Sequence, residues 1–95
     1  MRVLHARMPV ESQVQAEVTR YARERGWLVR RLQYIGRVGA PDIIAFRAGG
    51  YRLVEFKGSD GKLRPGQVAE HATLSKHGVL VYVIEDLETG YALFR

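Results

Sequence analysis

The sequence contains no cysteine, so disulfide bridges, thiolate nucleophiles, zinc ribbons and iron–sulfur ligation are all excluded. Any bound metal would have to be held by oxygen or imidazole ligands. The sequence also lacks a long apolar run, because the longest one, Val79–Ile84, is far shorter than a bilayer span. No apolar stretch typical of a signal peptide begins the chain. We therefore expect a cytoplasmic protein with no membrane partner.

Negative charge is scarce as well. Ten Asp and Glu residues stand against fifteen Lys and Arg residues, which gives a formal net charge of +5 and a pI near 10.0. This excess favours a polyanion as the partner over an acidic protein or a neutral small molecule. The hydrophobic fraction of 46% excludes disorder, and a length of 95 residues suits one hydrophobic core. Residues 1–95 are therefore predicted to form a single domain.

Glycine and proline divide the chain into short elements, and the spacing of apolar residues assigns each one. Helical spacings predict helices over 10–25 and 65–78, and β-rich runs predict strands over Trp27–Gln33, Asp42–Arg47, Tyr51–Lys57, Val79–Ile84 and Tyr91–Phe94. The order α-β-β-β-α-β-β indicates an α/β fold with a mixed sheet flanked by helices. The strands before and after the second helix should pair in parallel. The continuous apolar run Val79–Ile84 is typical of a central strand covered on both faces.

A tight turn at Ala48-Gly49-Gly50 joins two of these strands directly, so they are predicted to form an antiparallel hairpin. Asp42 begins the first strand, and Glu55 and Lys57 lie near the end of the second. All three residues are therefore expected at the same end of the hairpin. Because side chains alternate along a strand, Glu55 and Lys57 should point to the same face of the sheet.

Most of the ten acidic residues have simple structural explanations. Four lie in or beside glycine-containing loops, namely Asp60, Glu85, Asp86 and Glu88. Three fit exposed helix faces, namely Glu17, Glu24 and Glu70. Asp42 and Glu55 do not fit either group, because each lies where a sheet should be apolar. Burying either carboxylate without a partner would be costly.

These two carboxylates suit a hard divalent cation. Mg²⁺ prefers oxygen ligands and retains several waters, so Asp42, Glu55 and the neighbouring main-chain carbonyl of Phe56 could supply the protein half of its coordination. Lys57 could orient or help deprotonate an attacking water, or neutralise charge that develops on phosphorus. The structural alternative is that Glu55 and Lys57 form a partly buried ion pair and that Asp42 caps a turn.

The set formed by Glu11, Gly39-Ala40-Pro41-Asp42, Glu55-Phe56-Lys57 and Gln67 resembles the virus-type replication-repair nuclease domain, VRR-NUC, of the PD-(D/E)XK nuclease superfamily. The resemblance extends from Glu11 to about Ile84. It implies a restriction-endonuclease-like core, dependence on Mg²⁺ or Mn²⁺, and structure-selective cleavage of DNA. It also implies a role for each motif residue: Asp42 and Glu55 as metal ligands, Lys57 as the catalytic lysine, Glu11 as a supporting acid near the metal and Gln67 as a polar active-site residue.

Small stand-alone members of this family, of viral or bacterial type, are commonly homodimers that resolve four-way (Holliday) junctions. The resemblance therefore implies a homodimer that acts on branched or junction DNA. One departure is Arg64-Pro65-Gly66, where family members often have Ser or Thr before the proline, and this should weaken the start of the second helix. For Gln67, a solvent-facing position on that helix is the alternative to a place in the site.

Basic side chains near the proposed metal site are expected to form a DNA-facing edge. The predicted contacts are Arg30, Arg31, Arg37, Lys62 and Arg64, with Arg47 and Arg52 as further arginines beside the site. A solubilising surface is the alternative for each. The histidines are too scattered for a metal cluster, and His71 and His77 fit exposed helix positions. Two functions follow: a Mg²⁺-dependent structure-selective endonuclease, or a catalytically silent basic module that binds junctions or serves as a subunit.

Overall fold

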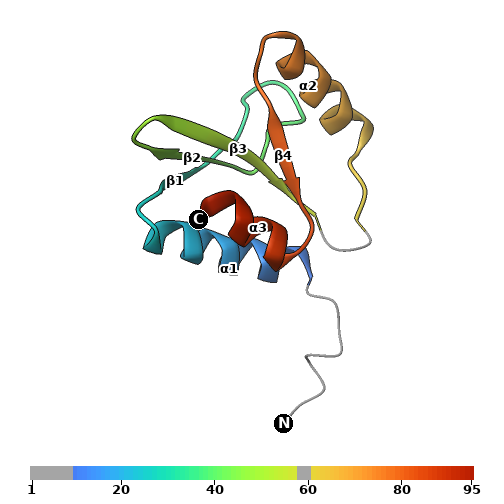
Figure 1. Cartoon of the computed structure of the whole chain (residues 1–95). Coiled ribbons are helices and arrows are strands. Elements are labelled where there is room, and N and C mark those ends of the chain that lie inside the picture. Colours follow the sequence, from blue (N-terminus) through green and yellow to red (C-terminus); the bar gives the residue numbers. More distant parts are fainter. Residues whose placement is uncertain (1–9, 58–60) are drawn as a thin grey trace.

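A computed structural model describes residues 10–57 and 61–95, so Asp60, which was expected in or beside a glycine-containing loop, lies outside the described residues. The elements are α1 (Glu11–Glu24), β1 (Leu28–Arg31), β2 (Ile43–Arg47), β3 (Gly50–Phe56), α2 (Pro65–Lys76), β4 (Val81–Ile84) and α3 (Leu87–Phe94). The strands form one mixed sheet in the order β1-β2-β3-β4 (Figure 1). Among the described residues, no helix has the length and apolar character needed to span a bilayer.

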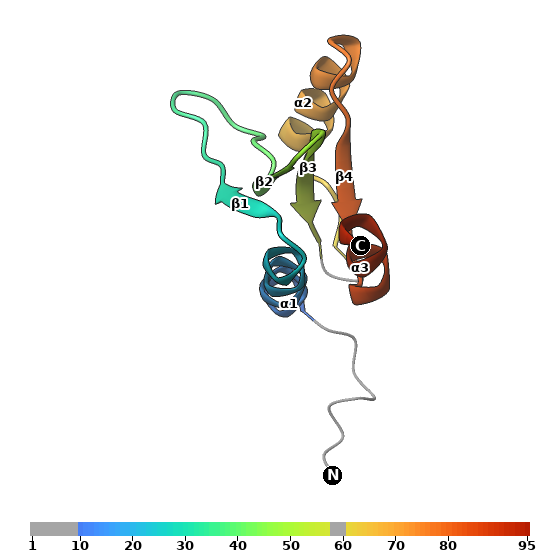
Figure 2. The ribbon, with the colours of Figure 1, turned by 60° about the vertical axis from the view of Figure 1, so that its left-hand side comes forward.

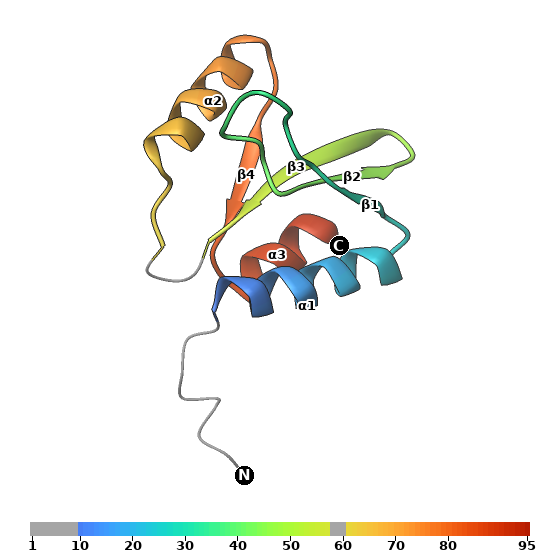
Figure 3. The ribbon, with the colours of Figure 1, turned by 180° about the vertical axis from the view of Figure 1, so that it is seen from behind.

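Helix α1 forms because its apolar residues recur at helical spacing and meet the sheet. Val14, Val18 and Ala22 are fully buried and pack with residues of the sheet such as Val54 and Phe56. Helix α3 lies beside α1 on the same side of the sheet, as Figures 1 and 3 both show. The hydrophobic core therefore fills the space between one face of the sheet and these two helices.

The predicted hairpin is present and sets the position of the site. Gly49, in the turn between β2 and β3, has a φ of +93°, which glycine adopts without strain. The antiparallel register pairs Arg47 with Gly50 and Ile43 with Val54. Alternation along β3 places Val54 in the core and Glu55 on the opposite face, which is the face toward α2 (Figure 2).

The predicted parallel pairing is also correct, but the position of the last strand in the sheet is not. Strand β4 pairs in parallel with β3, and it lies at the edge of the sheet instead of in the centre. Val81, Tyr82 and Val83 are half-buried, and only Ile84 in this strand is fully buried. Both α2 and α3 contact β4, so both faces of this edge strand are partly covered. Apolar residues therefore suit both faces.

The predicted final strand Tyr91–Phe94 is wrong, because these residues belong to helix α3. The Asp86 carboxylate caps this helix by accepting a 2.8 Å hydrogen bond from the Thr89 N–H. Leu87, Tyr91 and Phe94 recur at helical spacing and face the core or α1. The observed order is therefore α-β-β-β-α-β-α, with the mixed sheet and its flanking helices as predicted.

Candidate active site

Asp42 immediately precedes β2, and its backbone is hydrogen-bonded on both sides. Its N–H donates to the Val54 carbonyl at 2.9 Å, and its carbonyl accepts from the Leu32 N–H at 3.0 Å. The side chain turns toward β3, where Oδ2 accepts a 2.7 Å hydrogen bond from the Phe56 N–H. The antiparallel register ends with Ile43 opposite Val54, and the charge of Asp42 is near enough to raise the pKa of Glu55, so the two carboxylates lie close together.

Glu55 is 1% exposed, and its two carboxylate oxygens have different surroundings. Oε2 accepts a 2.9 Å hydrogen bond from Gln67 Nε2 and lies 3.6 Å from Lys57 Nζ. Oε1 is buried and has no hydrogen-bond partner within the described part of the chain. The pKa of Glu55 is raised to about 7, chiefly by burial and then by the charge of Asp42 with a smaller contribution from Glu11, while Lys57 opposes the shift.

The unpartnered Oε1 atom indicates what the site can hold. A buried carboxylate oxygen without a donor is unfavourable unless the group is protonated or a cation is placed beside it. The described residues contain no group of three or more acidic or histidine side chains at metal-binding distance. Mg²⁺ nevertheless needs only one or two carboxylates, because it retains several waters. The pair Asp42 and Glu55 therefore fits a hard divalent cation.

The backbone of Phe56 supplies a further oxygen on the same side. In an extended strand the N–H and carbonyl of one residue point in the same direction. The Phe56 N–H points to Asp42, and the following N–H, that of Lys57, points the other way to the Ile84 carbonyl at 2.9 Å. The Phe56 carbonyl is therefore directed toward Asp42, as a third protein ligand would require.

Lys57 and Glu11 both lie near this carboxylate pair. The Lys57 side chain is 11% exposed and forms the ion pair with Glu55, so the ion pair expected under the structural alternative is present. A catalytic role is compatible with the same geometry, because the ammonium stays beside the carboxylates. Glu11 is the first residue of α1, is half-buried, and is near enough for its charge to raise the pKa of Glu55.

Gln67 contacts the site from α2. Its Oε1 accepts a 2.8 Å hydrogen bond from the Arg64 N–H, while its Nε2 donates to Glu55. The first contact satisfies the Arg64 N–H, a backbone donor at the start of the helix. The Arg64 side chain does not cap the helix, which begins at Pro65. The second contact directs the Gln67 side chain to the Glu55 carboxylate, so Gln67 is not the solvent-facing residue of the alternative.

The predicted DNA-contacting residues are distributed unevenly. Arg31 pairs with Ile43 next to Asp42, and Arg30, Lys62 and Arg64 are exposed. Arg37 is exposed but forms a 3.3 Å ion pair with Glu70. Arg47 and Arg52 are not beside the site: their guanidinium groups lie 4.2 and 5.3 Å from the Trp27 ring centroid, toward the turn of the hairpin. Those two arginines pack on an aromatic ring, which the sequence pattern did not indicate.

Sequence reasoning missed the role of Glu70, which was expected on an exposed helix face. It is 7% exposed and accepts a 2.6 Å hydrogen bond from the Tyr34 hydroxyl in addition to the Arg37 contact. Burial, together with this hydrogen bond, raises the pKa of Tyr34. Glu70 follows Gln67 by three positions, and this helical spacing was the signal that could have revealed it. The contact ties α2 to the loop that leads into Asp42.

His71 is the other residue that the structure corrects. It is half-buried, and its Nε2 atom is buried without a partner among the described residues. Burial lowers the pKa of His71, and the nearby charge of Lys57 lowers it further while Glu70 acts in the opposite direction. His71 thus faces the site from one turn beyond Gln67, whereas His77 is exposed as predicted.

Comparison with known proteins agrees with the resemblance seen in the sequence. The family model of the VRR-NUC domain matches residues 6–85. A solved structure described as "VRR_NUC domain" superposes with a TM-score of 0.79 and 34% sequence identity, and the match covers 87% of this chain and 91% of that chain. A comparison with curated proteins gave no match. The matched range includes every residue of the site described above.

Proposed function

Because the chain belongs to the VRR-NUC domain family, a family of nucleases, we propose that it is a metal-dependent endonuclease that hydrolyses phosphodiester bonds in DNA. One observation carries this proposal: Asp42 and Glu55 lie close together, with Lys57 beside them and a buried carboxylate oxygen left without a partner among the described residues. A domain that only bound DNA would gain nothing from carboxylates near phosphates, because they repel.

The proposed mechanism assigns a role to each residue of the site. Asp42, Glu55 and the Phe56 carbonyl would hold Mg²⁺ or Mn²⁺, with Glu11 as a supporting acid. When bound, the cation polarises a phosphoryl oxygen and makes water a stronger nucleophile. Lys57 would orient or deprotonate the attacking water, or stabilise charge that develops on the phosphoryl oxygens. Gln67 would orient the Glu55 carboxylate through its hydrogen bond.

We propose branched DNA, and four-way junctions in particular, as the substrate, with a homodimer as the active species. A symmetric junction needs two paired cuts, and two copies related by a two-fold axis would supply two equivalent sites. A row of exposed apolar side chains supports an interface between copies. Leu28, Phe46 and Tyr51 stand in register across three strands on the face of the sheet opposite the core, and they are 50%, 41% and 44% exposed.

Cleavage assays test the activity directly. Labelled four-way junction, flap and linear duplex DNA are each incubated with the protein in EDTA, Mg²⁺ or Mn²⁺. We expect metal-dependent cleavage with a preference for the junction, and we expect Asp42→Ala and Glu55→Ala to abolish cleavage while DNA binding remains. Glu88→Ala, which removes an exposed acid of α3, is the matched control and should cut normally. Full activity of either site variant in Mn²⁺ would refute the ligand assignment.

Light scattering tests the oligomeric state. We expect a mass of twice the 10.8 kDa of one chain, alone or on junction DNA. Phe46→Glu should shift the protein toward the single-chain mass, because it places a charge in the apolar row. Leu80→Glu alters another exposed apolar residue outside the row and should leave the mass unchanged. A single-chain mass for the wild-type protein both free and on the junction would exclude the dimer.

A further inference from the structure

We propose that the groove between α1 and β1 binds the sugar-phosphate backbone of the DNA strand that leads to the active site. This inference rests on the proposed nuclease function and adds the path of the substrate. The groove has a volume of about 430 Å³ and is open to solvent. Its lining residues are Ser12, Gln15, Ala16, Thr19 and Arg23 from α1, Val29 and Arg31 from β1, and Ile43 from β2.

Helix α1 has three faces with different side chains, and one of them lines the groove. Residues are 100° apart around a helix, so Ser12, Gln15, Thr19 and Arg23 form one stripe along its length. The buried core stripe of Val14, Val18 and Ala22 lies about 120° away on one side. The core stripe holds α1 against the sheet, which leaves the polar stripe beside the edge strand β1.

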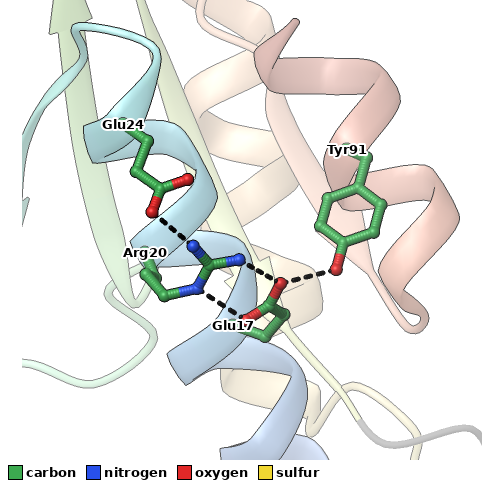
Figure 4. Close-up of polar contacts among 4 residues, drawn as sticks. All are labelled: Glu17, Arg20, Glu24 and Tyr91. Carbon is green, nitrogen blue, oxygen red and sulfur yellow. Dashed lines mark hydrogen bonds and ion pairs between the residues drawn. The ribbon is translucent and has the colours of Figure 1, made fainter.

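Two of the three acidic residues of α1, Glu17 and Glu24, lie on the third face, away from the groove, while Glu11 begins the helix near the proposed site. Arg20 is bonded to both Glu17 and Glu24, and the Tyr91 hydroxyl of α3 donates a 2.7 Å hydrogen bond to Glu17 (Figure 4). The bonds from Arg20, and next that from Tyr91, lower the pKa of Glu17, so this carboxylate remains ionised and engaged. Glu17 and Glu24 are thus engaged by Arg20 and lie away from the groove.

The side chains of the groove have the chemistry that phosphate contacts need. Every polar lining residue is a Ser, Thr, Gln or Arg, and each of these can donate a hydrogen bond to a phosphate oxygen. The lining contains two arginines and no acidic residue. The Thr19 hydroxyl oxygen is buried with no partner in the described part of the chain, which is unfavourable unless a ligand satisfies it.

The groove also has the position that the active site requires. Ser12 follows Glu11, Ile43 follows Asp42, and Arg31 pairs with Ile43. One end of the groove is therefore next to the backbone of Glu11 and Asp42. From Ser12 to Arg23 the helix rises about 16 Å, at about 1.5 Å per residue, which is long enough for several consecutive phosphates. A strand bound along the groove would be delivered to Asp42.

Binding measurements in EDTA test the groove without interference from cleavage. Fluorescein-labelled four-way junction and single-stranded DNA are titrated with protein by anisotropy at several salt concentrations. We expect Arg23→Ala and Arg31→Ala each to weaken binding about 3- to 10-fold, and to reduce the slope of log K against log salt by about one. Thr19→Val should weaken binding about 2- to 5-fold without lowering the melting temperature, because its hydroxyl has no partner in the free protein.

Two further variants separate the groove from general charge effects. Lys76→Ala removes one exposed positive charge at the far end of α2 and should leave affinity and salt slope close to wild type. Ala16→Leu fills the groove without changing charge or helix propensity and should weaken binding like the arginine variants.

The inference is overturned if neither arginine variant binds more weakly than Lys76→Ala. If that result is obtained while Asp42→Ala still abolishes metal-dependent cleavage, the groove assignment fails and the nuclease assignment stands. If the wild-type protein binds DNA through these arginines but cleaves no DNA in Mg²⁺ or Mn²⁺, the groove assignment stands and the nuclease assignment fails.

Discussion

Gln67 donates a 2.9 Å hydrogen bond from Nε2 to Oε2 of Glu55, which joins the first turn of α2 to the carboxylate at the centre of the site. The same side chain accepts from the Arg64 N–H through Oε1. One residue therefore stabilises the start of a helix and orients a proposed metal ligand. The position of α2 and the geometry of the site are consequently coupled.

This coupling predicts the effect of Gln67→Ala. We expect metal affinity or cleavage rate to fall about 10- to 100-fold, because Glu55 loses the donor that orients it. The measurement is cleavage rate as a function of Mn²⁺ concentration. Gln13→Ala is the matched control, since Gln13 has the same position in the first turn of α1 and, among the described residues, accepts only from the Val10 N–H at 3.1 Å. Equal effects of the two variants would show that Gln67 matters only as a helix cap.

The raised pKa of Glu55 predicts a dependence of stability on pH in metal-free protein. The pKa is about 7 in the fold against an ordinary value of 4.5, so the folded chain binds more protons than the unfolded chain between these two values. Stability contributed by the protonated group is therefore complete below about pH 4.5 and is lost as the pH rises through about 7. The total loss is about 3 kcal/mol.

Glu55→Gln removes this dependence, because the amide stays neutral at every pH. We expect the variant to be more stable than wild type at pH 8 in EDTA and close to wild type at pH 4. Urea unfolding at a series of pH values measures both proteins. Added Mg²⁺ should stabilise only the wild-type protein. A wild-type stability that rises relative to the variant between pH 5 and pH 8 would contradict the proposed environment of Glu55.

Lys57→Ala should reduce turnover more than metal affinity. We expect kcat to fall at least about 100-fold, because the ammonium acts on the water or on phosphoryl charge. Single-turnover cleavage at saturating Mn²⁺ gives the rate, and a metal titration gives the affinity. Lys76→Ala controls for the loss of a lysine at an exposed site. If Lys57 serves only as the ion-pair partner of Glu55, the variant will have a changed melting temperature with normal turnover.

Gly39→Ala should disturb the loop that leads into Asp42. Gly39 has a φ of +100°, and a Cβ atom there would lie 2.6 Å from the Gly66 carbonyl oxygen in α2. The variant must therefore move the loop away from α2, and we expect a loss of stability of about 3 kcal/mol or more together with a loss of cleavage. Gly36→Ala shares the positive φ but points into open space, so it should cost only about 1 kcal/mol.

Gly90→Ala should destabilise the protein although alanine favours helices. A Cβ atom at position 90 would lie 2.4 Å from Cγ2 of Val18, where α3 packs on α1. We expect a loss of about 1 to 3 kcal/mol in thermal or urea unfolding. Val18→Ala removes the clash, so the second substitution should be less harmful in that background than in wild type. Additive losses would show that the two helices do not meet at these residues.

Local patterns determined much of this protein from the sequence alone. The hairpin was predictable because a glycine turn and alternating side chains act over a few residues. The hairpin connection predicted Asp42, Glu55 and Lys57 at one end, and the structure brings them together there. The parallel pairing of β4 also followed from the length of the crossover that contains α2.

The tertiary structure decided the features that depend on contacts between distant segments. Gly90 is a poor helix former by itself, yet it lies within α3, where Val18 leaves no room for a larger side chain. Apolar content made β4 resemble a central strand, but it pairs only with β3 at the edge of the sheet, where α2 and α3 partly cover its two faces. Such outcomes follow from packing between elements, which no short window of sequence contains.

The surroundings of each charged side chain were decided in the same way. Composition established an excess of positive charge and left its distribution open. Folding pairs Arg37 with Glu70, stacks Arg47 on Trp27, and leaves Arg23 and Arg31 together in one groove. The sequence thus specified which chemical groups are available. The packing of α1 and α2 against the sheet determined which groups are buried and which remain accessible to DNA, because burial and ion pairing depend on neighbours brought together only by the fold.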